Sequence, residues 1–157
     1  MKRSGRLGQA AIYGAGCHAL PAVDGKAAVA TCTTGTGEYL IRTGLAKVIA
    51  ERVQLGSSAD AVSAMDDAFL HSPALHHVPQ PIGGVLVVSV DSKIGRIDCT
   101  VSHTAASMVA ACMFESDEQP RIMEVVQPSK SAGLSVCSVA CKILASAKRV
   151  EHLSLFK

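Results

Sequence analysis

Large aromatic side chains are scarce in this sequence. Tryptophan is absent, and three Phe and two Tyr make up only 3% of the 157 residues. The chain is long enough for one domain with a sizeable core, but that core must be built from Ala, Val, Leu and Ile. Because these side chains are small, we expect a partner surface to complete the core.

The sequence also lacks an apolar stretch that could cross a bilayer, although 48% of its residues are hydrophobic. A membrane-spanning helix needs about 20 consecutive apolar residues. The first five residues have no apolar core of the kind that signal peptides carry. We therefore expect an intracellular protein, in the nucleus or cytoplasm, without a membrane partner.

An excess of charge of one sign is missing as well. The 15 Lys and Arg residues against 13 Asp and Glu residues leave a formal net charge of +2. Nucleic-acid-binding domains gather basic residues on one face, so we expect no nucleic-acid partner.

Cysteine and histidine are present, but without the spacing of a metal site. The histidines at 76 and 77 are adjacent and point in different directions on any regular element. Cys137 and Cys141 would stack on one turn of a helix, yet no second ligand pair accompanies them. We expect no metal and no cofactor. All six cysteines lie in apolar segments of a chain without a secretory signal, which predicts reduced thiols in the core.

The most informative stretch is a glycine loop at residues 33–38. It lies between an apolar run of strand length and residues 39–53, where apolar side chains recur with helical period. The backbone N–H groups at a helix N-terminus can hold an anion or a developing oxyanion. Gly35 and Gly37 allow close approach, and Thr34 and Thr36 add hydroxyl donors. Spacing alone leaves a plain turn open as the alternative.

The remaining chain predicts one further helix and several strands. The helix covers residues 58–70, with Ser57 as N-cap. Strands are expected at 82–90, 96–102, 107–114 and 122–126. They follow one another directly and therefore predict an antiparallel sheet, and the continuous apolar run of the first indicates burial on both faces. In the tail, the apolar residues from Val136 to Ala147 fit one face of a helix.

No complete catalytic constellation can be read from spacing. Ser102 and His103 are neighbours on a predicted strand, so their side chains face opposite sides and cannot begin a triad. Paired carboxylates and a P-loop lysine are also missing.

Several motifs do occur in the order of a known family. The sequence resembles the β-subunit of the plant-type asparaginase superfamily of N-terminal-nucleophile hydrolases at residues 5–17, 34–38, 41–43 and 83–85. Within that superfamily it is most similar to the threonine aspartases (taspases) at Gln9, Phe69, Ser72-Pro73, Ser102-His103-Thr104 and Ser107-Met108.

The resemblance implies an α/β (α+β) fold, the αββα sandwich of these hydrolases. It implies an incomplete one, because the α-subunit and the first β-subunit strand, which carries the threonine nucleophile, have no counterpart here. Residues 1–135 are expected to form the β-subunit-like region, and residues 136–157 a divergent tail. Nuclear residence is implied by the resemblance alone.

The resemblance also assigns roles to individual residues. Thr34 and the backbone N–H of Gly35 match the oxyanion hole. Arg6 matches the arginine that grips the substrate's carboxylate, and Thr36 and Gly37 are further substrate-binding residues. The implied partners are protein substrates with an aspartate at the cleavage site, and the missing α-subunit region or a full-length subunit.

Gln9 distinguishes between two activities within the superfamily. The small-molecule asparaginases of this pattern have an aspartate there, which pairs with the substrate's α-ammonium. A neutral amide cannot supply that charge, so Gln9 favours an endopeptidase that cleaves after aspartate. The alternatives are an asparaginase or isoaspartyl peptidase, and a non-catalytic truncated paralogue that pairs with a full subunit. His18 stands where taspases usually have Trp.

Overall fold

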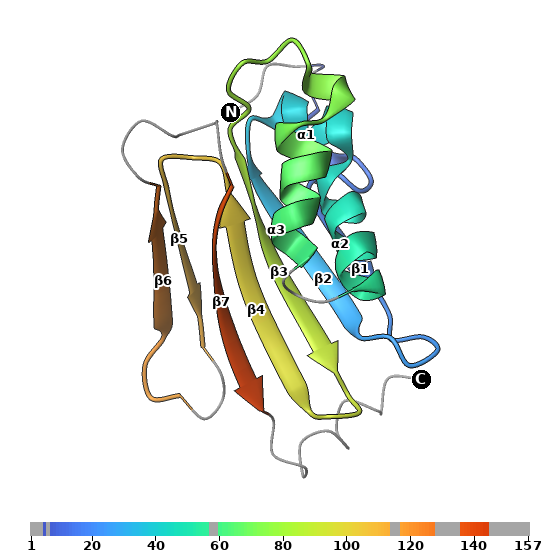
Figure 1. The fold of residues 1–157 in the computed structure, drawn as a ribbon, viewed down its shortest axis with the longest axis vertical. Helices are drawn as coiled ribbons and strands as arrows, with labels where there is room; N and C mark the ends of the chain where they lie inside the picture. Colours follow the sequence, from blue (N-terminus) through green and yellow to red (C-terminus); the bar gives the residue numbers. More distant parts are fainter. Residues whose placement is uncertain (1–4, 6, 57–59, 114–116, 128–135, 145–157) are drawn as a thin grey trace.

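The centre of the fold is an antiparallel sheet of five strands in the order β1-β2-β3-β4-β7 (Figure 1). The structure is a computed structural model that describes residues 5, 7–56, 60–113, 117–127 and 136–144. Two further strands, β5 and β6, pair as an antiparallel hairpin. The strands are β1 (Cys17–Leu20), β2 (Ala28–Gly35), β3 (Gly83–Asp91), β4 (Arg96–His103), β5 (Ser107–Cys112), β6 (Arg121–Val126) and β7 (Cys137–Leu144).

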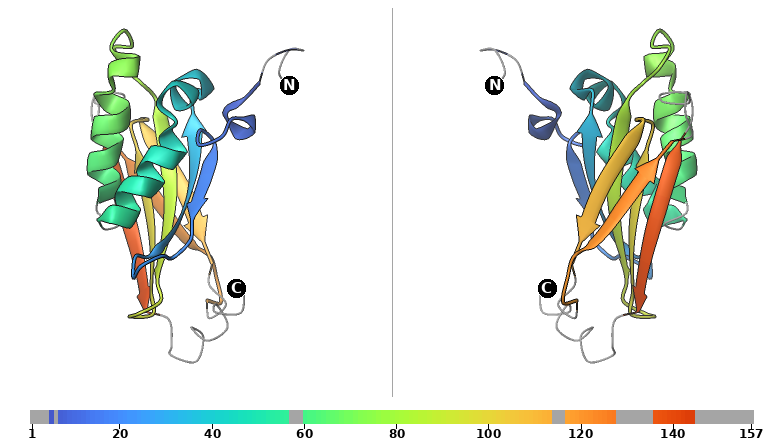
Figure 2. Two further views of the ribbon diagram at one scale, coloured as in Figure 1. Left: turned by 90° about the vertical axis from the view of Figure 1, so that its right-hand side faces the viewer. Right: turned by 90° about the vertical axis from the view of Figure 1, so that its left-hand side faces the viewer.

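Helices cover one face of this sheet (Figures 1 and 2). They are α1 (Gly37–Thr43), α2 (Leu45–Leu55) and α3 (Asp60–Met65), which continues into the π-helical turn η2 (Asp66–Leu70). Two short 3₁₀ turns are η1 (Gln9–Ala11) and η3 (Pro73–Leu75). Leu40, Ile49 and Phe69 of the helical layer form one core with Val85 and Val87 of β3. The apolar faces of the helices and of β3 therefore pack against each other on this side of the sheet.

The β5–β6 hairpin packs on the other face of the sheet. Met123 of the hairpin forms a second core with Cys99 and Val101 of β4, and Leu86 and Val88 of β3 are half-buried against it. Because β3 contacts a layer on each side, its apolar run is covered on both faces, as the sequence predicts. The mixed α/β class and the antiparallel sheet are likewise confirmed.

The first predicted helix is in fact two helices. Gly44 separates α1 from α2 and adopts φ +57°, a left-handed conformation that ends a helix. The apolar period continues across this break, which is why it reads as one helix. The second helix agrees with the prediction over the described residues from Asp60, whereas its expected start and N-cap at Ser57 lie outside them.

The helical interpretation of the tail is wrong. Residues 137–144 form strand β7, which pairs with β4 and places Cys137 opposite His103. Small apolar residues in a short segment fit either period, and pairing with a free sheet edge decides the outcome. Cys137 and Cys141 therefore lie on a strand, not on one helical turn.

The expectation that the cysteines are core residues holds only in part. Cys99 is buried and Cys112 is half-buried, but Cys17 and Cys32 are exposed, and all four are free thiols. Both exposed residues lie at the β1–β2 edge, on the face that the helices do not cover. No helix in the described part of the chain is long and apolar enough to span a membrane.

Candidate active site

Glycines hold the end of β2 tightly against the start of β3. Gly35 is the register partner of Gly83, and Thr34 is the partner of Gly84. A Cβ on Gly35, which has φ +134°, would lie 2.6 Å from the Cα of Gly83. A Cβ on Gly83 would in turn lie 2.6 Å from Cζ of Phe69. The position of the loop is thus set by backbone contact with β3 and by the helical core beneath it.

The backbone N–H of Gly35 makes no hydrogen bond to a neighbouring strand in the described part of the chain. The N–H of Thr36 donates to Ile82 O at 3.1 Å, and the N–H of Thr33 donates to Gly16 O at 2.8 Å. Alternate residues of a strand donate to opposite sides, so the Gly35 N–H points away from β3, as does that of Thr33. Among the described residues no acceptor is found for it. It is therefore available to an external ligand.

Thr34 presents its side chain beside this free N–H. Thr34 and Gly35 are both exposed. The Thr34 hydroxyl makes no hydrogen bond to any described residue, and the side chain lies on the sheet face opposite the helices. Two adjacent donors without a partner among the described residues are thus exposed at this loop, and donors in such an arrangement can bind an anion.

Gln9 lies next to the start of α1. A Cβ on Gly37 would come within 2.7 Å of the Gln9 side-chain oxygen Oε1. Gln9 belongs to η1 and is half-buried, whereas Thr36, the N-cap of α1, is exposed and makes no side-chain capping bond. The structure therefore brings Gln9 to the loop that contains Thr34, Gly35, Thr36 and Gly37.

Arg6, the predicted carboxylate-binding residue, lies outside the described residues. It is three positions before Gln9 in the sequence. The binding of the substrate's carboxylate by Arg6 therefore stays a prediction.

His103 is a buried polar residue to which the sequence assigns no catalytic or binding role. It lies on β4 in register with Gly84, and therefore in one row with Thr34 across three strands. Its Nδ1 lies 3.0 Å from the Ala105 carbonyl oxygen. Since a carbonyl only accepts, Nδ1 donates, and Nε2 has no partner among the described residues. Ser102 points to the opposite, helical face, so the two side chains do not meet.

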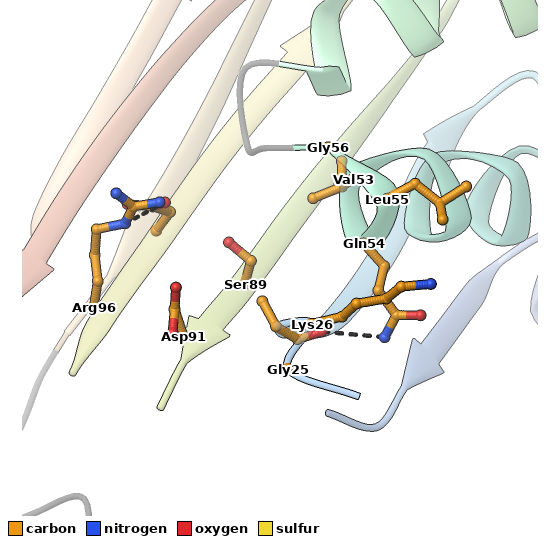
Figure 3. Close-up of a pocket in the computed structure, with 11 residues that line it drawn as sticks. Gly25, Lys26, Val53, Gln54, Leu55, Gly56, Ser89, Asp91 and Arg96 are labelled. Atoms are coloured by element: carbon orange, nitrogen blue, oxygen red, sulfur yellow. Dashed lines mark hydrogen bonds and ion pairs between the residues drawn. The ribbon is translucent and has the colours of Figure 1, made fainter. Parts of the chain in front are cut away.

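A cavity of about 240 Å³ lies at the other end of the sheet (Figure 3). Its polar wall includes Asp98, which is only 2% exposed and whose Oδ2 lies 3.0 Å from Arg96 Nε. Gln54 donates to Ala27 O at 3.1 Å and so ties α2 to the loop before β2. Asp98 thus pairs with Arg96, and Gln54 bonds to Ala27; both pairs lie at the end of β2 remote from Thr34. We interpret the polar groups of this cavity as structural.

The described residues contain no group of three His, Cys, Asp or Glu side chains that could hold a metal ion.

A family model described as asparaginase matches residues 1–123. The matched segment includes Gln9, the glycine loop and the helical layer, and it ends within β6, before β7.

Proposed function

Because this chain belongs to the asparaginase family, whose members are hydrolases of the N-terminal-nucleophile superfamily, we propose that it contributes the oxyanion and substrate-binding part of a threonine-type endopeptidase of the taspase class. The substrates are proteins, cleaved after an aspartate. The nucleophilic threonine comes from a segment outside this chain, and the chain alone is inactive. With that segment, the two sheets and the helical layer described above would become part of an αββα sandwich.

The chemistry assigns each group one task. The threonine hydroxyl outside this chain attacks the carbonyl carbon of the scissile bond while its own α-amino group takes the proton. Negative charge then develops on the former carbonyl oxygen. The Thr34 hydroxyl and the Gly35 N–H donate hydrogen bonds to that oxygen and stabilise the tetrahedral intermediate. The intermediate then collapses: the C–N bond breaks and the proton passes to the leaving amine. Water hydrolyses the resulting acyl-threonine ester, which frees the carboxylic acid product and restores the threonine hydroxyl.

The observation that supports an endopeptidase is the contact between Gln9 and the start of α1. A small substrate such as asparagine carries an α-ammonium, which calls for a nearby carboxylate. The Gln9 amide approaches the glycine loop at Gly37 and carries no charge. An aspartate within a polypeptide has no free α-ammonium, so a neutral amide suits it better.

The substrate profile tests this assignment. The chain is assembled with a nucleophile-bearing segment and assayed on a peptide with an internal aspartate, on L-asparagine and on an isoaspartyl dipeptide. We expect cleavage of the peptide after aspartate and no release of aspartate from the small substrates. Release from the small substrates alone would replace the proposal with an asparaginase or isoaspartyl peptidase activity.

Replacing Gln9 by aspartate should shift the preference toward small substrates. A carboxylate at this position adds a partner for the α-ammonium, and one charge-assisted hydrogen bond corresponds to about a tenfold or greater gain in kcat/KM. Gln9→Asn, which adds no charge, is the matched control. Equal small-substrate activity in Gln9→Asp and Gln9→Asn would argue against the role of Gln9.

Replacing Arg6 by alanine should lower kcat/KM for the aspartate-containing peptide about 10–100-fold, because the substrate carboxylate loses its charged partner. Arg52→Ala is a suitable control, since Arg52 is exposed on α2 and pairs with Asp67. The measurement compares peptides with aspartate and with asparagine at the cleavage site. Arg6→Ala enzyme that still prefers aspartate would contradict the assignment.

A further inference from the structure

Two exposed thiols face each other across the first two strands. Cys17 of β1 and Cys32 of β2 are register partners, and both are free and exposed. Ala19 and Ala30, the next residues on the same face, are exposed as well. Because both cysteines are exposed in the described structure, a small oxidant can reach them.

The backbone geometry brings these side chains close together. The hydrogen bond from Thr33 N–H to Gly16 O, at 2.8 Å, flanks the Cys17–Cys32 position and makes it a non-hydrogen-bonded pair. Opposite Cα atoms in such a pair lie about 4.5 Å apart, with their side chains adjacent. This separation falls within the range of about 4.4–6.8 Å that a disulfide spans. The two strands need not move for the sulfurs to bond.

We propose that Cys17 and Cys32 form a reversible disulfide when the protein meets a peroxide. One cysteine, as its thiolate, attacks hydrogen peroxide and breaks the O–O bond, which gives a sulfenic acid and hydroxide. The second thiolate attacks the sulfenic sulfur and displaces a second hydroxide, and the two protons released by the thiols convert both hydroxides to water. The two sulfurs supply the two electrons that reduce the peroxide. A dithiol reductant reverses the reaction by exchange.

The disulfide acts on the strand that ends at the candidate oxyanion loop. Residues two apart in a strand share a face, so Cys32 lies on the same face as Thr34. A covalent link from Cys32 to β1 constrains β2 directly before this loop. The thiol chemistry is expected of this chain by itself, whereas an effect of the disulfide on the oxyanion loop rests on the proposed function.

Peptide mapping provides a direct test, because Lys26 separates the two cysteines. Trypsin cleaves after Arg6, Lys26 and Arg42, so residues 7–26 and 27–42 are separate peptides with one cysteine each. The native full chain is treated with hydrogen peroxide, alkylated and digested. We expect one linked peptide pair about 2 Da lighter than the sum of its parts, which dithiothreitol separates.

Variants and a denatured sample make the result specific. Cys17→Ser and Cys32→Ser should each abolish the linked pair, and Cys112→Ser, at a half-buried cysteine of the hairpin, should retain it. The oxidised wild-type chain should melt about 5–10 °C above the reduced chain, and oxidised Cys32→Ser should show no such rise. Recovery of two unlinked peptides after native oxidation would overturn the proposal. A yield of the linked peptide pair after oxidation in urea as high as that after oxidation in native buffer would also overturn it.

Discussion

Replacing Thr34 by valine is expected to lower the turnover number of the assembled enzyme about 10²–10³-fold, the usual cost of removing one oxyanion donor. Valine keeps the branched shape of threonine and removes only the hydroxyl. The Thr34 side chain is exposed and makes no hydrogen bond to any described residue, so the fold loses no contact. The loss should therefore appear in kcat, while the melting temperature stays nearly constant.

Two matched variants separate the chemistry from the structure. Thr34→Ser retains the hydroxyl and should keep most of the turnover. Thr43→Val removes a hydroxyl in α1 that bonds to Tyr39 O at 2.9 Å, away from the loop, and should leave kcat unchanged. Wild-type turnover in Thr34→Val would refute the oxyanion role of this residue.

Replacing Phe69 by alanine is expected to lower the free energy of unfolding by about 3–5 kcal/mol. The Phe69 side chain is 0% exposed and is among the largest in the core. Its ring lies where a Cβ on Gly83 would be, and Gly83 in turn lies against Gly35. Truncation therefore leaves a cavity directly beneath the backbone that positions the candidate oxyanion loop.

Denaturant titration of the full chain measures this effect. Leu55→Ala is the control, because Leu55 is 73% exposed and its truncation should change the free energy of unfolding by about 0.5 kcal/mol or less. Equal stability of the two variants would show that the helical layer does not pack on the sheet at Gly83. If Phe69→Ala is folded, its turnover should also fall in the assembled enzyme, since Gly35 loses its support.

Part of the fold follows from the period of the side chains. The central strands and the helices beside them were predictable because a buried face repeats every second residue in a strand and every three to four in a helix. The loop between β2 and α1 was predictable for the same reason, since the period changes there. Gly44 and β7 were not, because a glycine in an apolar helix pattern and a short run of small residues each allow two conformations.

The sequence predicts which residues belong to the candidate site, but not how they lie relative to one another in space. The order of the glycines, Gln9 and Gly83-Gly84 pointed to a hydrolase family, and the match to the asparaginase model supports that family. Spacing could not reveal that β2 extends past the end of its pairing with β1, so that the Gly35 N–H has no strand partner on that side. It also could not reveal that Cys17 and Cys32, separated by a loop, face each other in register.

The local sequence determines where strands and helices form, because backbone conformation and the periodic burial of side chains act over a few residues. The tertiary structure alone decides which groups meet: Gln9 with Gly37, Phe69 with Gly83, and Cys17 with Cys32. The physical reason is that strand register and the packing of α1 and α3 on the sheet join residues far apart in the chain. These contacts convert a glycine loop, which most sequences use only as a turn, into a candidate oxyanion hole.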